Sequence, residues 1–178
     1  MRVSRKTILL VFTVVIVTAA GFTVYWASIP HLPWLFKGAY AVYSGKTTVL
    51  FIPVEFTFRL EVLDYNSTHV KMLTYQRIDG FASIENSTTA WQPLIKTTGS
   101  APPSRTYESD LYVEGIGLRH CMVYVYEGYN NVSTVYVDKG INWPLKFQYN
   151  YTYSFLWSDV PLFLDLRMTD TNIPGLKK

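Results

Sequence analysis

Residues 52–62 read IPVEFTFRLEV, and an apolar side chain occupies every second position of this stretch. Successive side chains of a β-strand point to opposite faces, so a strict period of two predicts a strand with one buried and one solvated face. Residues 64–67, DYNS, are typical of a turn. We expect residues 68–77 to return as a partner strand, with Val70 and Met72 on the buried face.

Alternation of the same kind recurs along the rest of the chain. It is found, with turn signals between most of the segments, in residues 107–115, 118–126, 145–157 and 160–168. No segment after residue 36 has a helical period. We therefore predict an all-β domain of about seven to nine antiparallel strands, arranged as a curved sheet, a partial barrel or a sandwich.

Residues 79–106 interrupt this pattern. They contain two glycines, three prolines and many Ser and Thr residues. Such a composition predicts a long loop or two short edge strands. A long loop in a compact domain is often functional, so this region is one that a ligand or partner could reach.

The N-terminal region is apolar. Residues 7–36 contain no Lys, Arg, Asp or Glu. Within them, residues 8–26 would span about 29 Å as a helix, close to the thickness of a bilayer core. The basic residues that precede the run are Arg2, Arg5 and Lys6. Because basic flanks stay in the cytoplasm, we predict one transmembrane helix that exports the C-terminal part of the chain.

The predicted organisation therefore has three parts. They are a cytoplasmic basic tail at residues 1–6, a transmembrane anchor or uncleaved signal at residues 7–29, and an extracytoplasmic β-domain at residues 30–178. Two alternatives stay open. Residues 18–20 suit the cleavage site of a signal peptide, and the apolar run could instead be a buried helix of a soluble protein.

The charge of the predicted exported domain is balanced. The chain has 16 Lys and Arg residues against 13 Asp and Glu, and three of the basic residues precede the apolar run. This leaves 13 residues of each sign beyond it. The net charge of +3 is therefore a topology signal, and we expect no nucleic-acid partner.

Four N-glycosylation sequons (Asn-X-Ser/Thr) lie beyond the apolar run, at Asn66, Asn86, Asn131 and Asn150. We expect the first three in turns or loops, where glycan acceptors are exposed. The sequons and the charge rule agree on an extracellular location, so we predict a cell-surface glycoprotein. A polar, Thr-rich surface without glycans is the alternative.

One predicted strand, residues 145–157, carries a row of large aromatic side chains at alternate positions: Phe147, Tyr149, Tyr151, Tyr153, Phe155 and Trp157. Such a row is typical of a core built from large rings, because aromatic side chains bury much area. The functional interpretation is a face that receives an apolar ligand or a partner chain.

Chemistry-bearing residues are sparse. The three histidines are His31, His69 and His120, and Cys121 is the only cysteine, which we expect to be a buried small apolar residue. No His follows Cys121, which argues against a blue-copper site, and zinc-site spacings are absent. No nucleophile elbow, P-loop or dinucleotide motif occurs. We therefore predict no enzyme activity, metal or cofactor, with an exported hydrolase as the least favoured alternative.

Residues 38–43 read GAYAVY and residues 134–146 read TVYVDKGINWPLK. The second stretch resembles a hairpin of LolA-like and LprG-like lipoprotein carriers, and that resemblance implies a curved antiparallel sheet over an apolar cavity. With its anchor, abundant Tyr and Thr, several sequons and single Cys, the chain is also similar to archaeal membrane-anchored surface proteins.

Two functional hypotheses follow. In the first, the chain is a non-enzymatic, membrane-anchored extracellular β-domain, either a structural component of the cell surface or an accessory subunit of a membrane complex. Its partners would be the lipid bilayer and another protein. In the second, the domain is an extracytoplasmic carrier or sensor of an apolar ligand, which the aromatic row would bind.

Overall fold

The computed structural model describes residues 32–49, 52–79, 83–94, 102–155 and 158–176. These residues form nine strands: β1 (Tyr40–Val49), β2 (Ile52–Tyr65), β3 (His69–Asp79), β4 (Ile84–Pro93), β5 (Arg105–Val113), β6 (Gly117–Glu127), β7 (Asn131–Asp138), β8 (Pro144–Phe155) and β9 (Ser158–Thr171). The predicted all-β class is confirmed. Within these ranges no helix is long and apolar enough to cross a membrane. The expected anchor at residues 7–29 lies outside the described residues.

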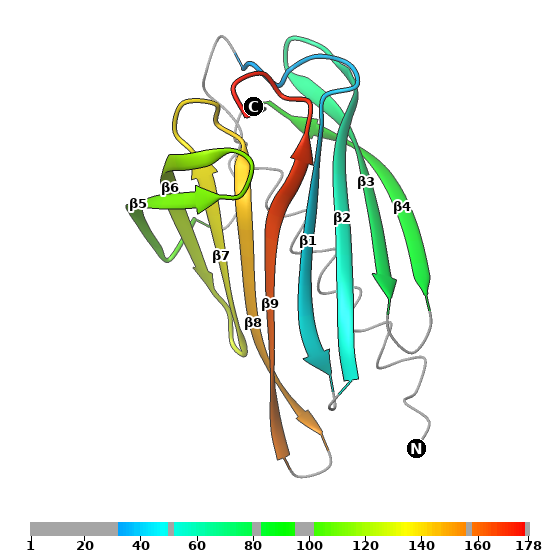
Figure 1. Cartoon of the computed structure of the whole chain (residues 1–178), viewed down its shortest axis with the longest axis vertical. Helices are drawn as coiled ribbons and strands as arrows, with labels where there is room; N and C mark the ends of the chain where they lie inside the picture. The colour runs from blue at the N-terminus through cyan, green and yellow to red at the C-terminus, as the bar shows by residue number, and fades with distance from the viewer. Residues whose placement is uncertain (1–31, 50–51, 80–82, 95–101, 156–157, 177–178) are drawn as a thin grey trace.

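All nine strands belong to one antiparallel sheet, in the order β4-β3-β2-β1-β9-β8-β7-β6-β5. From β1 at the centre, the chain proceeds strand by strand to the edge strand β4 (Figure 1). It resumes at the opposite edge with β5 and returns to the centre with β9. No ladder joins β4 to β5 in the described ranges. The strands thus form one open sheet and not the two separate sheets of a sandwich.

The region predicted as a long loop or edge strands contains a complete strand. β4 pairs with β3 at ten successive positions, from His69 opposite Pro93 to Ile78 opposite Ile84. Most side chains of β4 are exposed. An edge strand of this kind has only one neighbour and needs few apolar residues, which explains why its composition resembles that of a loop.

The central pair β1–β9 joins the two ends of the described domain. Thr171 Oγ1 donates to the carbonyl oxygen of Tyr40 at 2.6 Å. Asn172 Oδ1 accepts from Tyr40 N at 2.7 Å, and its Nδ2 donates to the carbonyl oxygen of Gly38 at 2.8 Å. These side-chain bonds extend the β1–β9 ladder beyond its last backbone pair, and we call the β1–β9 pair with these bonds the seam.

The larger part of the hydrophobic core lies against one side of the sheet. Directly opposite residues of antiparallel strands share a face, so the register defines this side. We call it the apolar face; its buried apolar members include Ala41, Tyr43, Val54, Phe56, Phe58, Leu60, Val62, Val70, Met72, Val135, Tyr149, Leu162, Leu164, Leu166 and Met168. The strict alternation of residues 52–62 is confirmed, because all five apolar positions from Val54 to Val62 are buried.

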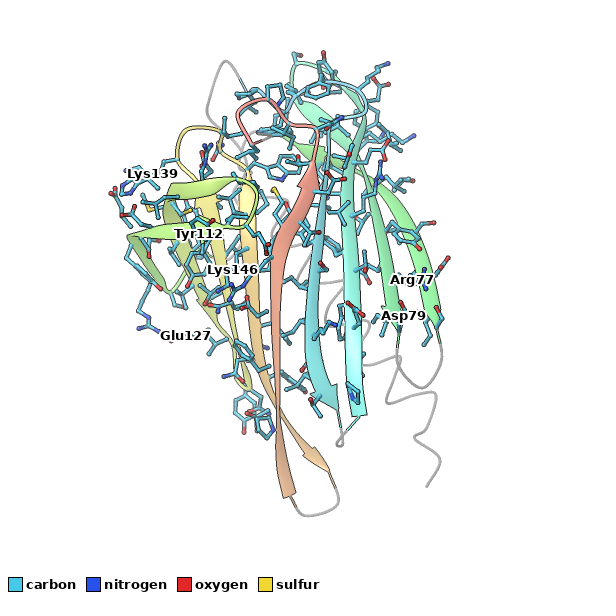
Figure 2. All side chains as sticks on the ribbon, viewed as in Figure 1. Arg77, Asp79, Tyr112, Glu127, Lys139 and Lys146 are labelled. Carbon is cyan, nitrogen blue, oxygen red and sulfur yellow. The ribbon has the colours of Figure 1, made fainter. Side chains whose placement is uncertain are left out.

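The opposite side, the polar face, carries ion pairs between residues two apart on one strand. Arg59 contacts Glu61 at 2.8 Å, and Arg77 contacts Asp79 at 2.8 Å. Figure 2 shows Arg77 and Asp79 on the β3–β4 side of the sheet, away from the β5–β6 hairpin. Exposed pairs of this kind contribute little to stability, so the β2–β3 part of this face is solvated. At β6, by contrast, the same face carries the buried side chains of Cys121, Val123 and Val125.

Candidate functional site

An aromatic cluster occupies the centre of the apolar face. The ring of Tyr43 lies 5.0 Å from Phe147 and 5.8 Å from Phe58, and the last two rings are 6.1 Å apart. β1, β2 and β8 therefore each contribute one ring. Their tilted and edge-on geometries are the favoured ones for aromatic pairs, so this part of the face is a packed core.

The loops at one end of the sheet are tied to this cluster by hydrogen bonds. The Nε1 atom of Trp143 donates to the Tyr43 hydroxyl at 2.7 Å, and that hydroxyl donates to the carbonyl oxygen of Pro144 at 2.8 Å. Trp34 packs edge-on against Trp143 at 5.2 Å. Burial raises the pKa of Tyr43 well above its usual value, so the hydroxyl stays neutral.

The aromatic row predicted as a ligand face is described in part. Phe147, Tyr149 and Tyr151 all lie on the apolar face, opposite Leu166, Leu164 and Leu162 of β9. The Tyr149 and Tyr151 rings stack with centroids 6.2 Å apart. The side chains of the other three members lie outside the described residues: Tyr153, Phe155 and Trp157.

Two glutamines interrupt the apolar character of this side at β3 and β4. Gln76 is 6% exposed and lies between Phe58 of β2 and Asn86 of β4 in the register. Within the described part of the chain, neither its Nε2 nor its Oε1 atom has a hydrogen-bond partner. Gln92 is 8% exposed, and its Oε1 atom also has no hydrogen-bond partner in the described part of the chain. Buried side-chain amides are normally bonded, so these two require an explanation.

One lysine of the polar face is also buried. Lys146 is 7% exposed, and its Nζ lies 3.4 Å from Asp165 Oδ1 and 5.2 Å from the centre of the Tyr136 ring. Arg167 contacts the other carboxylate oxygen of Asp165 at 3.0 Å. The carboxylate thus compensates two cations, and a structural role accounts for this triad.

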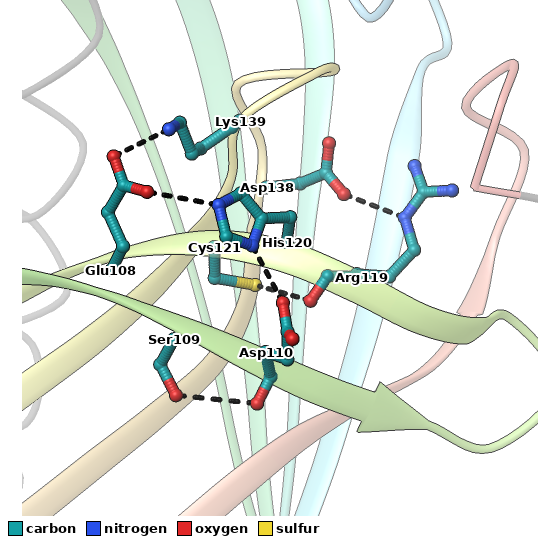
Figure 3. A network of polar contacts seen from close by, with 8 residues as sticks. All are labelled: Glu108, Ser109, Asp110, Arg119, His120, Cys121, Asp138 and Lys139. Atoms are coloured by element: carbon teal, nitrogen blue, oxygen red, sulfur yellow. Dashed lines mark hydrogen bonds and ion pairs between the residues drawn. The ribbon is translucent and has the colours of Figure 1, made fainter.

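A network of charged side chains joins β5, β6 and the turn between β7 and β8 (Figure 3). The Nδ1 atom of His120 lies 2.6 Å from Asp110 Oδ1, and its Nε2 atom lies 3.0 Å from Glu108 Oε2. The other oxygen of Glu108 accepts from Lys139 Nζ at 2.6 Å. We call these four residues the His120 network.

The His120 network is electrostatically balanced. The hydrogen bond to Asp110, and then the one to Glu108, raises the pKa of His120. The bond from Lys139 is the main reason that the pKa of Glu108 is lowered. All four side chains are well exposed to solvent. In the described ranges no group of His, Cys, Asp or Glu has a metal-binding arrangement, so the network is a cross-strand ion cluster.

Cys121 follows His120 in β6 but lies on the other face. It is fully buried and not in a disulfide. Burial raises the pKa of its thiol to about 11, which makes the sulfur a poor nucleophile. A buried cysteine is what the alternating pattern of this strand predicts.

The four sequon asparagines lie in different settings. Asn66 lies in the β2–β3 turn, where its Oδ1 accepts from the backbone of Thr68 at 2.9 Å and of His69 at 2.7 Å. Asn86 and Asn150 are exposed on β4 and β8, and Asn131 is half-buried at the start of β7. The expectation of a turn or loop is therefore confirmed for Asn66 and wrong for Asn86, which lies inside the edge strand β4, and for Asn131, which is the first residue of β7.

Gln76, Gln92 and the His120 network are features that the sequence analysis missed. The network had only a weak signal, the turn-forming residues Gly115 and Gly117. Counting outward from a turn at residues 115–117 would pair Asp110 with Met122, whereas the turn of the structure, at residues 114–116, pairs Asp110 with His120. For Gln76 the alternation indicates only the inner face; the burial of both glutamines without a partner depends on neighbours from other strands.

Comparison with known proteins provides little information about the function of the chain. No family model and no curated protein sequence matches the chain. Among solved structures, the chain is similar to a domain described as an outer membrane lipoprotein-sorting protein of Vibrio parahaemolyticus, with 10% sequence identity, a TM-score of 0.29, and coverage of 78% of this chain and 86% of that one. The description of that domain names lipoprotein sorting, and residues 134–146 of this chain resemble a hairpin of LolA-like lipoprotein carriers. The TM-score is too low to carry a functional argument, and no comparison supports the archaeal resemblance.

Proposed function

We propose that the chain is a non-enzymatic, extracytoplasmic carrier or sensor that binds a largely apolar ligand with one polar group on the apolar face of its sheet. The supporting observation is Gln76, a buried amide without a partner in the described residues. A single-pass anchor at residues 7–29 would keep the domain at the cell membrane. This proposal adopts the carrier hypothesis of the sequence analysis.

The unbonded amide of Gln76 lowers the stability of the ligand-free protein. A buried polar group that lacks a hydrogen bond costs about 1–3 kcal/mol. Leucine at this position would avoid the cost, since both neighbours on β2, Phe56 and Phe58, are apolar and buried. A ligand with an apolar body and a hydrogen-bonding group would satisfy the amide and pack on the rest of the face. Phe147, Tyr149 and Tyr151 extend the same face toward the other half of the sheet.

The test compares the ligand content of two variants of the full chain purified from native membranes. Native mass spectrometry should find one amphipathic molecule on the unmodified protein. Gln76→Leu should weaken retention about tenfold, the effect of one hydrogen bond of about 1.4 kcal/mol, and should stabilise the ligand-free protein. Gln148→Leu, which removes a glutamine from the polar face, should retain the molecule as before. An unmodified protein without a bound molecule would overturn the proposal.

A second candidate function is an accessory or structural subunit that binds a protein partner. The observation in its favour is the open sheet, because β4 and β5 each have one edge that no described strand pairs. Large exposed side chains lie on these strands: Trp91, Tyr107 and Tyr112. An exposed edge is a template for strand addition by a partner.

Cross-linking in native membranes separates the two candidates. A subunit should cross-link to one protein in constant stoichiometry through β4 or β5. Proline in place of Thr89, at the middle of β4, should abolish that cross-link if β4 is the docking edge and leave lipid retention unchanged. Recovery of the chain without any partner would count against this candidate.

A further inference from the structure

One row of side chains on the polar face crosses β7, β8 and β9. Val132 lies opposite Asn150, and Asn150 lies opposite Phe163. Opposite residues have Cβ atoms about 4.5–5.5 Å apart. The sequon asparagine is therefore flanked on both sides by an apolar side chain on the same face.

Both flanking side chains are exposed to solvent. Phe163 is 52% exposed and Val132 is 39% exposed, while Asn150 between them is exposed as well. Pro161, opposite the sequon residue Thr152, is a third exposed apolar neighbour on this face. Single exposed apolar residues are normal on protein surfaces. Three around one sequon form a small platform with a modification signal at its centre.

We propose that Asn150 carries an N-linked glycan whose first sugar ring packs on Phe163 and Val132. In the transfer, Nδ2 of Asn150 displaces the pyrophosphate of a lipid-linked oligosaccharide at the sugar C1. The C1–O bond breaks as the C1–N bond forms, and Nδ2 loses one proton. The proposal goes beyond ligand binding on the other face and rests only on the extracytoplasmic location.

The chemistry of the first sugar suits this platform. A pyranose ring presents C–H groups on one side, and the face of an aromatic ring is the negative end of its quadrupole, so the two attract. The sugar hydroxyl groups on its other side would stay in water. The other sequons have different surroundings: Asn66 is in a turn, Asn86 lies opposite the buried Gln76, and Asn131 is half-buried opposite Tyr151.

The test uses the full chain expressed in yeast, whose secretory pathway attaches N-glycans. Peptide mass spectrometry should find sugar on Asn150. Phe163→Ala should lower the melting temperature by about 2–4 °C in the glycosylated protein. The same substitution should lower it by less than about 1 °C in a Thr152→Ala background, which keeps Asn150 but destroys its sequon.

Thr88→Ala is the matched control, because it destroys the sequon of Asn86 and should leave the effect of Phe163→Ala unchanged. Equal effects of Phe163→Ala with and without the Asn150 sequon would overturn the proposal. So would an unmodified Asn150 beside a glycosylated Asn86, a result that leaves the exported location standing. Sugar on none of the four asparagines would overturn the proposal and the location together, while lipid retention would still report on the carrier function.

Discussion

At the scale of single residues, the hydroxyl group of Tyr43 is a buried polar group of the core with two hydrogen bonds. It accepts from Trp143 and donates to the carbonyl oxygen of Pro144, with all three residues buried. Tyr43→Phe removes both bonds without opening a cavity. We expect the free energy of unfolding to fall by about 2 kcal/mol, because a buried group that loses its partner costs about 1–3 kcal/mol.

Urea unfolding of the two proteins measures this difference if the slope of the transition is unchanged. Tyr136→Phe is the matched control, because its hydroxyl is only half-buried and its bond to Gln148 is long, at 3.3 Å. The control should change stability by less than about 0.5 kcal/mol. A Tyr43→Phe protein as stable as the control would show that the two core bonds do not contribute to folding.

Gln76 shows how far the sequence predicts a single residue. Its distance from Val70 and Met72 is an even number of positions, so the alternation places it correctly on the inner face. The pattern does not show that its amide is buried without a partner. That property depends on Phe58 and Asn86, which lie opposite Gln76 on neighbouring strands. The alternation within one strand does not determine its register with the next strand.

At the scale of elements, the β5–β6 hairpin should be sensitive to pH through the His120 network. The raised pKa of His120 stabilises the folded hairpin fully below the ordinary His value of 6.5, and this contribution is lost as the pH rises through the folded pKa. The lowered pKa of Glu108 gives a contribution to stability with the opposite pH dependence. Its contribution is present above the ordinary Glu value of 4.5 and is lost as the pH falls through the folded pKa.

The two shifts together predict that the network stabilises the hairpin most between about pH 4.5 and 6.5. The groups that face His120 are Asp110 and Glu108 of β5 and Lys139 after β7. Amide exchange of β5 and β6 measured from pH 5 to 8, corrected for intrinsic rates, should show protection falling at the alkaline end. His120→Gln should flatten that profile, and an identical profile in the variant would contradict the prediction.

In the same hairpin, the position of the turn predicts one contact of the His120 network but not another. Gly115 and Gly117 both adopt positive φ, at 78° and 93°, a conformation that glycine adopts readily in a tight turn. Once the turn is known, the Asp110–His120 pair follows by counting. The contact between Glu108 and Lys139 cannot be found by counting, because Lys139 lies in a different turn, the one between β7 and β8.

At the scale of the whole molecule, the seam is the feature that local pattern could not predict. Every other ladder joins strands that are consecutive in the chain, and hairpin signals indicated most of them. The β1–β9 pair brings residues such as Ala41 and Thr171 together across nearly the whole domain. No periodicity encodes a partner so distant. For the same reason, the alternation left open whether the strands form one open sheet.

The seam should also control the cooperativity of unfolding. Among the described residues, it is the only strand ladder between the β1–β4 half of the sheet and the β5–β9 half, which also contact each other through the rings of Tyr43, Phe58 and Phe147. Gly45 lies where a Cβ atom would overlap the backbone oxygen of Asp165 in β9. Gly45→Ala must therefore move the two strands apart, at a cost of about 1–3 kcal/mol. Since the seam is common to both halves, we expect amide protection to fall in both.

Native-state hydrogen exchange measures this effect strand by strand. Protection in the unmodified protein should be highest in β1 and β9 and lowest in the edge strands β4 and β5, which have one neighbour each. Gly140→Ala is the control, since its Cβ would meet only the Asp138 carboxylate at 3.4 Å. Loss of protection confined to one half in Gly45→Ala would mean that the halves fold independently. The apolar face would then be two surfaces, and a ligand that spans β2, β3 and β8 would have to bind both at once.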